Sequence, residues 1–256
     1  MRLIFPRHVL SALALSAAAL GPLGLSASNP PGYPPFAKSE YTPARLGPHE
    51  PDVEVDYPGS ATARGIPKGM AVVSILVGAD GKAIDYLLVN CTDPAFGTAL
   101  LDEAKTLKFA AANFKGIAVP ARFNLGYNFV PNDKSIAVNA MDAARAKIGG
   151  IDPPAATYSA VSEGKLDRPL EFTRAVMPQL PADYRGADAK TVMVFVTFYV
   201  DEQGHARAPN VESAVSPGLI PAALRAVAQW SFKPPLAKGK PALVFAGRAV
   251  GFVASK

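Results

Sequence analysis

Two stretches of this chain share a pattern of residues at one constant offset, and this repeat constrains the fold more than any other feature. A shift of 123 places Gly81 on Gly204 and Phe109 on Phe232. The other matched positions are Val73 with Val196, Leu101 with Leu224, Lys115-Gly116 with Lys238-Gly239, and Phe129 with Phe252. No gap is needed between them. We interpret the repeat as a tandem duplication, because a chance match would not keep one offset through so many positions.

The second stretch, residues 168–256, has the clearer pattern of secondary structure. It contains a run of β-branched and aromatic side chains, a composition that suits a strand in a half-buried sheet. Gly204 ends a polar turn and is free to take a positive φ, so the chain can reverse there as a hairpin. The expected order is a strand over 191–200, a strand over 205–213, a helix over 217–230 and a last strand over 242–254.

The ordered motifs of this second stretch resemble those of the TonB C-terminal domain family. They are Phe198-Tyr199-Val200-Asp201-Glu202-Gln203-Gly204, the Ala-rich run 222–228, Trp230-Ser231-Phe232-Lys233-Pro234 and Lys238-Gly239-Lys240-Pro241. The first copy, 52–131, departs from the pattern, with Leu107 in place of the Trp and Ala110-Ala111-Ala112 in place of Lys-Pro-Pro. The resemblance implies an α+β fold of two tandem copies of a small β-β-α-β unit. Each copy would be a three-stranded antiparallel sheet with one helix packed on it.

Three aromatic residues are expected to belong to the structural core. Trp230 and Phe232 follow the helix of the second copy and would fix its end to the sheet. Phe109 takes the position of Phe232 in the first copy. Burying a side chain of this size stabilises a fold by about 1.5–3 kcal/mol relative to leaving it exposed. We therefore expect Trp230 to be structural and not to bind a ligand.

The N-terminal segment, residues 1–28, has the layout of a secretory signal peptide. Basic residues begin it, residues 9–20 form an apolar core, and Ser26-Ala27-Ser28 is a small-residue cleavage site. Gly21-Pro22 interrupts the apolar run before it reaches the ~20 residues that span a bilayer. We therefore expect a periplasmic protein. The alternative is anchorage in the inner membrane by an uncleaved segment over 9–25.

Two further segments are expected to have no core of their own. Residues 29–51 are rich in proline and have little periodicity, which predicts an extended and largely unpacked arm. Residues 132–167 are interpreted as a linker that contains a short helix over 135–147, closed by Gly149-Gly150. The boundary between the two copies is placed in this linker.

Composition and motif content argue against several classes of function. The chain has 26 basic and 21 acidic residues and no basic run, which is unlike a protein that binds nucleic acid. Cys91 is its single cysteine, so neither an intramolecular disulfide nor a paired-cysteine metal or redox site is expected. The sequence has only three histidines and no catalytic or phosphate-loop motif. We therefore expect no enzymatic activity, no cofactor and no metal site.

The resemblance also implies where a partner would bind. Members of the family use the last strand as an exposed edge, and an extended peptide from an outer-membrane receptor pairs with it. Unpaired N–H and C=O groups make such an edge a template for another strand. Gly247 and Gly251 would let another backbone approach closely, and Arg248 would add a charge that steers the partner. The residues of the expected edge are Leu243, Val244, Phe245, Gly247, Arg248, Val250, Gly251 and Phe252.

Two functional hypotheses remain open from the sequence. The first is a periplasmic, TonB-like module that binds a protein or an extended peptide by strand addition, with a role in TonB-dependent transport across the outer membrane. The second is a structural, self-associating periplasmic protein without a transport role. In that case a dimer would form through the sheet edges.

Overall fold

The computed structural model describes residues 30–48, 53–130, 138–139, 155–182, 184, 192–214 and 216–253. These residues form a mixed α+β fold, rich in strands and with few helices, in which the main strands pair antiparallel. The coarse fold class predicted from the sequence is therefore confirmed. The expected signal peptide and the alternative anchor lie outside the described residues. No helix within the described ranges combines the length and the apolar character that crossing a membrane requires.

The first sheet is built around β3 (Gly69–Val77), which pairs antiparallel with β4 (Ala83–Cys91) and with β8 (Ala121–Phe129). Every residue of β3 is buried, because this central strand is covered on both faces. Helix α2 (Pro94–Ala104) packs on one of these faces. The carboxylate of Asp93 caps this helix by accepting a hydrogen bond from the backbone of its first turn.

The second sheet has the same arrangement around β13 (Met193–Val200). This strand pairs antiparallel with β14 (Ala206–Ser213) and with β18 (Val244–Gly251). Helix α4 (Leu219–Val227) packs against β13 and β14. The side chains of β13 are buried except at its first residue, in agreement with the apolar and β-branched composition of this segment.

Short elements complete the two halves of the chain. β6 pairs with β7 and β16 with β17 as small hairpins, and β12 pairs with β15. The bounds are α1 (Gly59–Ala63), β5 (Phe109–Ala110), β6 (Ala112–Phe114), β7 (Ile117–Val119), η1 (Glu163–Lys165), β12 (Phe172–Arg174), β15 (Ser231–Phe232), β16 (Leu236–Ala237) and β17 (Lys240–Pro241).

The prediction of three-stranded sheets is wrong, because short strands extend both sheets. The first sheet has five strands in the order β10-β4-β3-β8-β9, and the second has four in the order β11-β18-β13-β14. The added strands are β9 (Val138–Asn139), β10 (Tyr158–Ser159) and β11 (Val161–Ser162). They give hydrogen-bond partners to parts of edges that would otherwise be unpaired.

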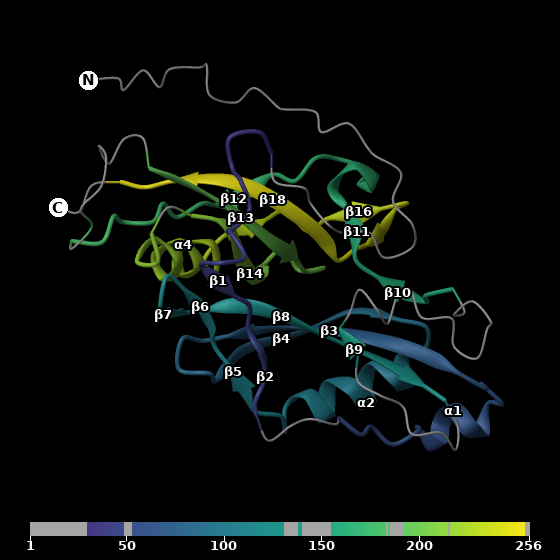
Figure 1. Cartoon of the computed structure of the whole chain (residues 1–256). Helices are drawn as coiled ribbons and strands as arrows, with labels where there is room; N and C mark the ends of the chain where they lie inside the picture. Colours follow the sequence, from purple (N-terminus) through teal and green to yellow (C-terminus); the bar gives the residue numbers. More distant parts are fainter. Residues whose placement is uncertain are drawn as a thin grey trace.

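The segment interpreted as a linker is a structural part of both sheets. Tyr158 lies opposite Cys91 in the first sheet, and Val161 lies opposite Val244 in the second. In Figure 1 the chain passes directly from β10, beside the lower sheet, to β11, beside the upper one. The helix expected over 135–147 lies outside the described residues except for β9, which is a strand.

The proline-rich segment, expected to be an unpacked arm, also pairs with the first half of the chain. Its strands β1 (Tyr41–Thr42) and β2 (Arg45–Leu46) pair antiparallel with β6 and β5. Phe36 stacks on Tyr41 with ring centres 4.5 Å apart, and it contacts Phe114 at 4.7 Å. Proline content therefore predicted the extended backbone but not the packing, which depends on the aromatic side chains between the prolines.

The two main sheets pack against each other, with β14 in contact with β3, β4 and β8 and a buried apolar cluster between them. Alternation along a strand sends neighbouring side chains to opposite faces. Phe198 of β13 therefore packs on Trp230 beyond the end of α4, whereas its neighbour Tyr199 points toward the first sheet. The buried apolar residues between the sheets are Met70, Val72, Leu87, Val89, Ala160, Tyr199, Ala208, Leu243 and Phe245.

Candidate functional site: the outer edge of strand β18

Alternate residues of β18 and its flanks point their backbone groups away from β13. The carbonyl of Leu243 accepts a hydrogen bond of 2.8 Å from the N–H of Val161. At the other end, the N–H of Val253 donates to the carbonyl of Pro178 at 3.0 Å. Because the direction of these groups repeats every second residue, the outward set is Leu243, Phe245, Gly247, Ala249, Gly251 and Val253. The even-numbered residues point their groups toward β13.

The beginning of this outer edge is covered by β11. This short strand runs parallel to β18, with Val161 opposite Val244 and Ser162 opposite Phe245. The first part of the predicted binding edge is therefore paired within the chain. Sequence patterns could not indicate this, because a strand of two residues has no measurable periodicity.

The end of the outer edge is covered by a second segment. Gln179 lies in parallel register with Val253, and Leu180 donates its N–H to the Val253 carbonyl at 2.8 Å. In a regular parallel ladder, the next donor toward the middle of the edge would be the N–H of residue 178. This residue is a proline and has no N–H, so the pairing ends there.

Three outward-facing residues lie open between these covered ends. They are Gly247, Ala249 and Gly251, and Ala249 is exposed. Within the part of the chain that the structure describes, their backbone N–H groups and the carbonyls of Ala249 and Gly251 have no backbone hydrogen-bond partner. At about 3.3 Å per residue the open stretch is about 13 Å long, which matches an extended segment of about five residues.

The chain between the two covering segments is bound elsewhere, and this keeps the middle of the edge open. The carboxylate of Asp167 accepts hydrogen bonds of 2.8 and 2.7 Å from the N–H groups of Lys238 and Gly239. Further on, β12 pairs with β15. The indole N–H of Trp230 then donates to the carbonyl of Val176 at 2.7 Å. Among the residues that the structure describes, the chain therefore leaves the middle of the edge without a backbone partner.

Arg248 lies at the open stretch, and its guanidinium is hydrogen-bonded within the chain. Its guanidinium donates two hydrogen bonds to the carboxylate of Glu163, at 2.8 and 2.5 Å. The same group donates at 2.8 Å to the carbonyl of Gly247, the one outward carbonyl of the stretch that is occupied. The two side chains are about one third exposed, at 29% and 32%. Arg248 therefore joins the open edge to the residue that follows β11.

The two glycines of the edge have different surroundings. A Cβ on Gly247 would lie 2.7 Å from the ring of Phe195, so this glycine makes room for a side chain of the neighbouring strand. A Cβ on Gly251 would meet no atom within 4 Å. The lack of a side chain at Gly247 therefore serves the packing of Phe195, and the approach of a partner backbone at Gly251 stays a prediction.

The remaining predicted edge residues have buried side chains that belong to the hydrophobic core. The edge residues that are buried are Leu243, Val244, Phe245, Val250 and Phe252, and the predicted core residues Trp230, Phe232 and Phe109 are buried as well. Trp230 packs edge-on against Phe198 and Phe172, at ring distances of 5.6 and 5.2 Å. Its environment is that of a structural residue.

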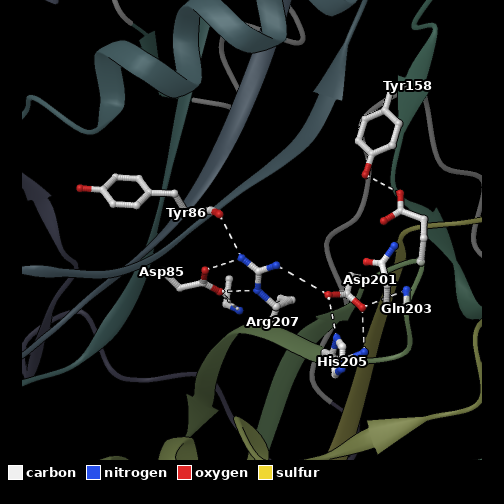
Figure 2. Close-up of polar contacts among 9 residues, drawn as sticks. Asp85, Tyr86, Tyr158, Asp201, Gln203, His205 and Arg207 are labelled. Atoms are coloured by element: carbon white, nitrogen blue, oxygen red, sulfur yellow. Dashed lines mark hydrogen bonds and ion pairs between the residues drawn. The ribbon is translucent and has the colours of Figure 1, made fainter.

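A polar cluster joins the second sheet to the first (Figure 2). The guanidinium of Arg207 donates to the carboxylate of Asp85 at 3.0 and 2.5 Å and to the carbonyl of Tyr86 at 3.2 Å. The backbone N–H of Ala208, a residue with φ of 41°, donates to the same carboxylate at 3.1 Å. Hydrogen bonding to Asp85 raises the pKa of Arg207.

The turn between β13 and β14 belongs to this cluster. The carboxylate of Asp201 accepts hydrogen bonds from the N–H groups of Gln203 and His205, at 3.1 and 2.7 Å. It also lies 3.6 Å from the guanidinium of Arg207. On the other side of the turn, Tyr158 donates its hydroxyl to Glu202 at 2.8 Å. Burial, followed by this carboxylate, raises the pKa of Tyr158.

Arg122 of β8 is the second polar connection between the sheets. Its side chain is 7% exposed and donates to the Thr197 hydroxyl at 2.9 Å and to the Ala208 carbonyl at 3.1 Å. The guanidinium carbon lies 5.2 Å from the ring centres of both Tyr199 and Phe245. Phe245 belongs to β18, so this contact fixes the covered part of the edge to the first sheet.

The sequence argument missed the residues that join the sheets and the partner of Arg248. Arg122 is the only charged residue of β8, and a charged residue inside a strand is a usable signal that a partner is present. Glu163 and Asp85 have no such signal, because their arginine partners are 85 and 122 residues away. No group of three or more His, Cys, Asp or Glu side chains in the described ranges is placed to hold a metal ion.

Comparison with known proteins found no matching family model, no matching curated protein and no matching solved structure. The resemblance to the TonB C-terminal domain family therefore remains a hypothesis from the residues, and a functional argument depends on the geometry of the edge.

Proposed function

We propose that this protein is a binding module that adds an extended segment of a partner protein to the outer edge of β18. The observation that carries the proposal is the open stretch Gly247, Ala249 and Gly251, which lies between two ends that the chain itself covers. An edge with unpaired N–H and C=O groups gives a partner main-chain hydrogen bonds without a prior change of fold. The covered ends limit the partner to one position along the edge.

We also propose that the two halves are tandem copies of one β-β-α-β unit, extended by the short added strands. The turns at Gly81 and Gly204, which are separated by the offset of 123, have the same backbone conformation and support this proposal. Gly81 and Gly204 have φ of 79° and 91°. A Cβ at either of these glycines would lie within 2.8 Å of the carbonyl oxygen of the equivalent phenylalanine, Phe109 or Phe232.

The proposed setting is the periplasm, and the proposed partner is a short extended segment of an outer-membrane receptor or of another envelope protein. The ordered motifs from Phe198 to Pro241 support the relation to the TonB C-terminal domain family. In this setting strand addition at β18 would link the chain to TonB-dependent transport. The expected signal peptide is consistent with such a location.

A proline substitution at one position of β18 tests the binding edge directly. Ala249→Pro removes an outward N–H and leaves the pairing with β13 intact, so the chain should fold and lose capture of its partner from an envelope extract. Val250→Pro removes an inward N–H and is the matched control, which should unfold the second sheet. Circular dichroism reports folding. If folded Ala249→Pro still captures the partner at the wild-type level, the edge is not the binding site.

Self-association through the same edge is the second candidate function. The open stretch of one chain could pair with that of a second copy, because an edge with unpaired N–H and C=O groups is a template for any extended strand. Sedimentation of the full chain over a range of concentrations distinguishes the two functions. A dimer that dissociates in Ala249→Pro would favour self-association, and a monomer at all concentrations would exclude it.

A further inference from the structure

We infer that Arg248 selects a carboxylate on the incoming segment, and that Glu163 holds this arginine until the segment replaces it. The inference rests on the proposed function, because it concerns the same edge. It follows from the position of one side chain between the open stretch and the end of β11.

The carbonyl of Gly247 is one of the outward acceptors of the open stretch. A strand added to the open stretch needs the outward carbonyls as acceptors for its own N–H groups. The carbonyl of Gly247 is taken by the Arg248 guanidinium at 2.8 Å. An incoming N–H therefore competes with the Arg248 guanidinium for this carbonyl, and a full ladder bond is favoured when Arg248 changes its position.

The charge of Arg248 has an anionic partner in the folded chain. Its guanidinium is bound to both oxygens of Glu163, an arrangement in which two parallel N–H···O bonds are formed. A movement that breaks these bonds leaves an arginine, about one third exposed, without an anion beside it. A segment that brings its own carboxylate restores the bonds, and a segment with a neutral or basic side chain at this position does not. Selectivity for acidic segments follows.

Glu163 has a fixed position beside the edge. It follows β11 directly and begins η1, so it is held beside the edge by the pairing of Val161 and Ser162 with β18. A carboxylate held in this way competes with any carboxylate in solution for the same guanidinium. Glu163 therefore lowers the affinity of the edge for every segment, and it excludes segments whose side chains cannot replace it at Arg248.

The test uses the immobilised full chain and a displayed library of random linear peptides as the probe. Wild type should enrich peptides that contain Asp or Glu. Arg248→Glu should lose this enrichment and favour Lys or Arg, and Arg248→Gln should show no preference for charge. Arg225→Glu, at an exposed position on α4, is the matched control and should keep the wild-type preference. For one selected acidic peptide, Glu163→Gln should bind about two- to fivefold more tightly than wild type, because a partly exposed ion pair has a modest strength.

The outcomes separate the two proposals. If wild type enriches peptides without acidic residues, and Ala249→Pro abolishes their binding, strand addition stands and the role of Arg248 is overturned. Equal acidic enrichment by wild type and by folded Arg248→Glu overturns it as well, as does weaker binding of the acidic peptide to Glu163→Gln. If wild type enriches no peptide at all, the proposed function fails and this inference fails with it.

Discussion

Arg122 and Phe245 are in contact across the two sheets, and their positions differ by 123, the offset of the repeated sequence pattern. The guanidinium carbon of Arg122 lies 5.2 Å from the centre of the Phe245 ring. Asp85 and Ala208 also have the offset of 123 and are joined by a hydrogen bond of 3.1 Å. In a two-fold interface a residue near the axis meets its own equivalent. Both contacts are those expected if the proposed copies pack about such an axis.

This packing has a consequence for the proposed binding edge. The backbone of Phe245 lies beside β11, and its ring contacts Arg122 of the first sheet. The first part of β18 is therefore held by contacts with both β11 and the first sheet. The open stretch begins two residues later, at Gly247. The first sheet therefore anchors the edge without covering the part that is proposed to bind a partner.

Replacing Arg122 by methionine should lower the free energy of unfolding of the full chain by about 1–3 kcal/mol, because buried acceptors lose their donor. The acceptors are the Thr197 hydroxyl and the Ala208 carbonyl. Chemical denaturation measures the change. Arg225→Met, at an exposed position, is the control and should change the same quantity by less than about 0.5 kcal/mol. Equal effects at the two positions would show that Arg122 does not stabilise the contact between the sheets.

A double-mutant cycle on Asp85 and Arg207 should reveal a coupling energy of about 0.5–3 kcal/mol. These residues are joined by two hydrogen bonds, and their side chains are 22% and 33% exposed. The single replacements by alanine and the double replacement are compared by denaturation of the full chain. The exposed pair Asp102 and Lys105 on and beside α2 is the matched control, for which about 0.2–0.5 kcal/mol is expected. A coupling energy no larger than that of the control pair would contradict the role of this cluster.

Sequence reasoning predicted the main strands and helices because these have a clear period or composition. The segment that forms β13 is rich in apolar and β-branched residues, which favour a strand over a helix. The turn at Gly204 needs a residue that tolerates a positive φ. These are local properties. They determine which segments form strands and where the chain reverses.

The covered parts of the edge could not be predicted, because they depend on contacts between distant residues. The pairing of Val161 with Val244 involves a strand of two residues and runs parallel to its neighbour. The bond from Arg248 to Glu163 connects residues that are 85 positions apart. The open stretch of the edge is what remains after these contacts form, so its limits are a tertiary property.

Replacing Trp230 by alanine should cost about 3–5 kcal/mol of folding free energy, as other large-to-small changes in a core do. Trp230 is 6% exposed and packs against Phe198. Its indole N–H also holds the Val176 carbonyl, so the variant should weaken the segment that leads to the covered end of the edge. Thermal and chemical denaturation measure the effect. Ile84→Ala, at a position of β4 that is 65% exposed, is the control and should change the same quantity by less than about 0.5 kcal/mol.

The stability of the chain should fall as the pH rises from about 10 to about 12, in part because of Tyr41. Burial, assisted by the nearby carboxylate of Glu212 and opposed by Arg122, raises the pKa of Tyr41 from 10.0 to about 12. The folded chain therefore holds the phenol proton more tightly than the unfolded chain does. Stability from this difference is fully present below pH 10 and is lost as the pH rises through the folded pKa.

Urea denaturation of wild type and of Tyr41→Phe from neutral pH to pH 12 measures this loss. The variant has no phenol proton at this position, so it should lose less stability than wild type above pH 10. Part of the loss should remain, because the pKa of Tyr158 is also raised by burial and by Glu202. Below pH 10 the two proteins should differ by a constant amount. If the difference stays constant up to pH 12 as well, the burial of Tyr41 does not control the alkaline stability of the chain.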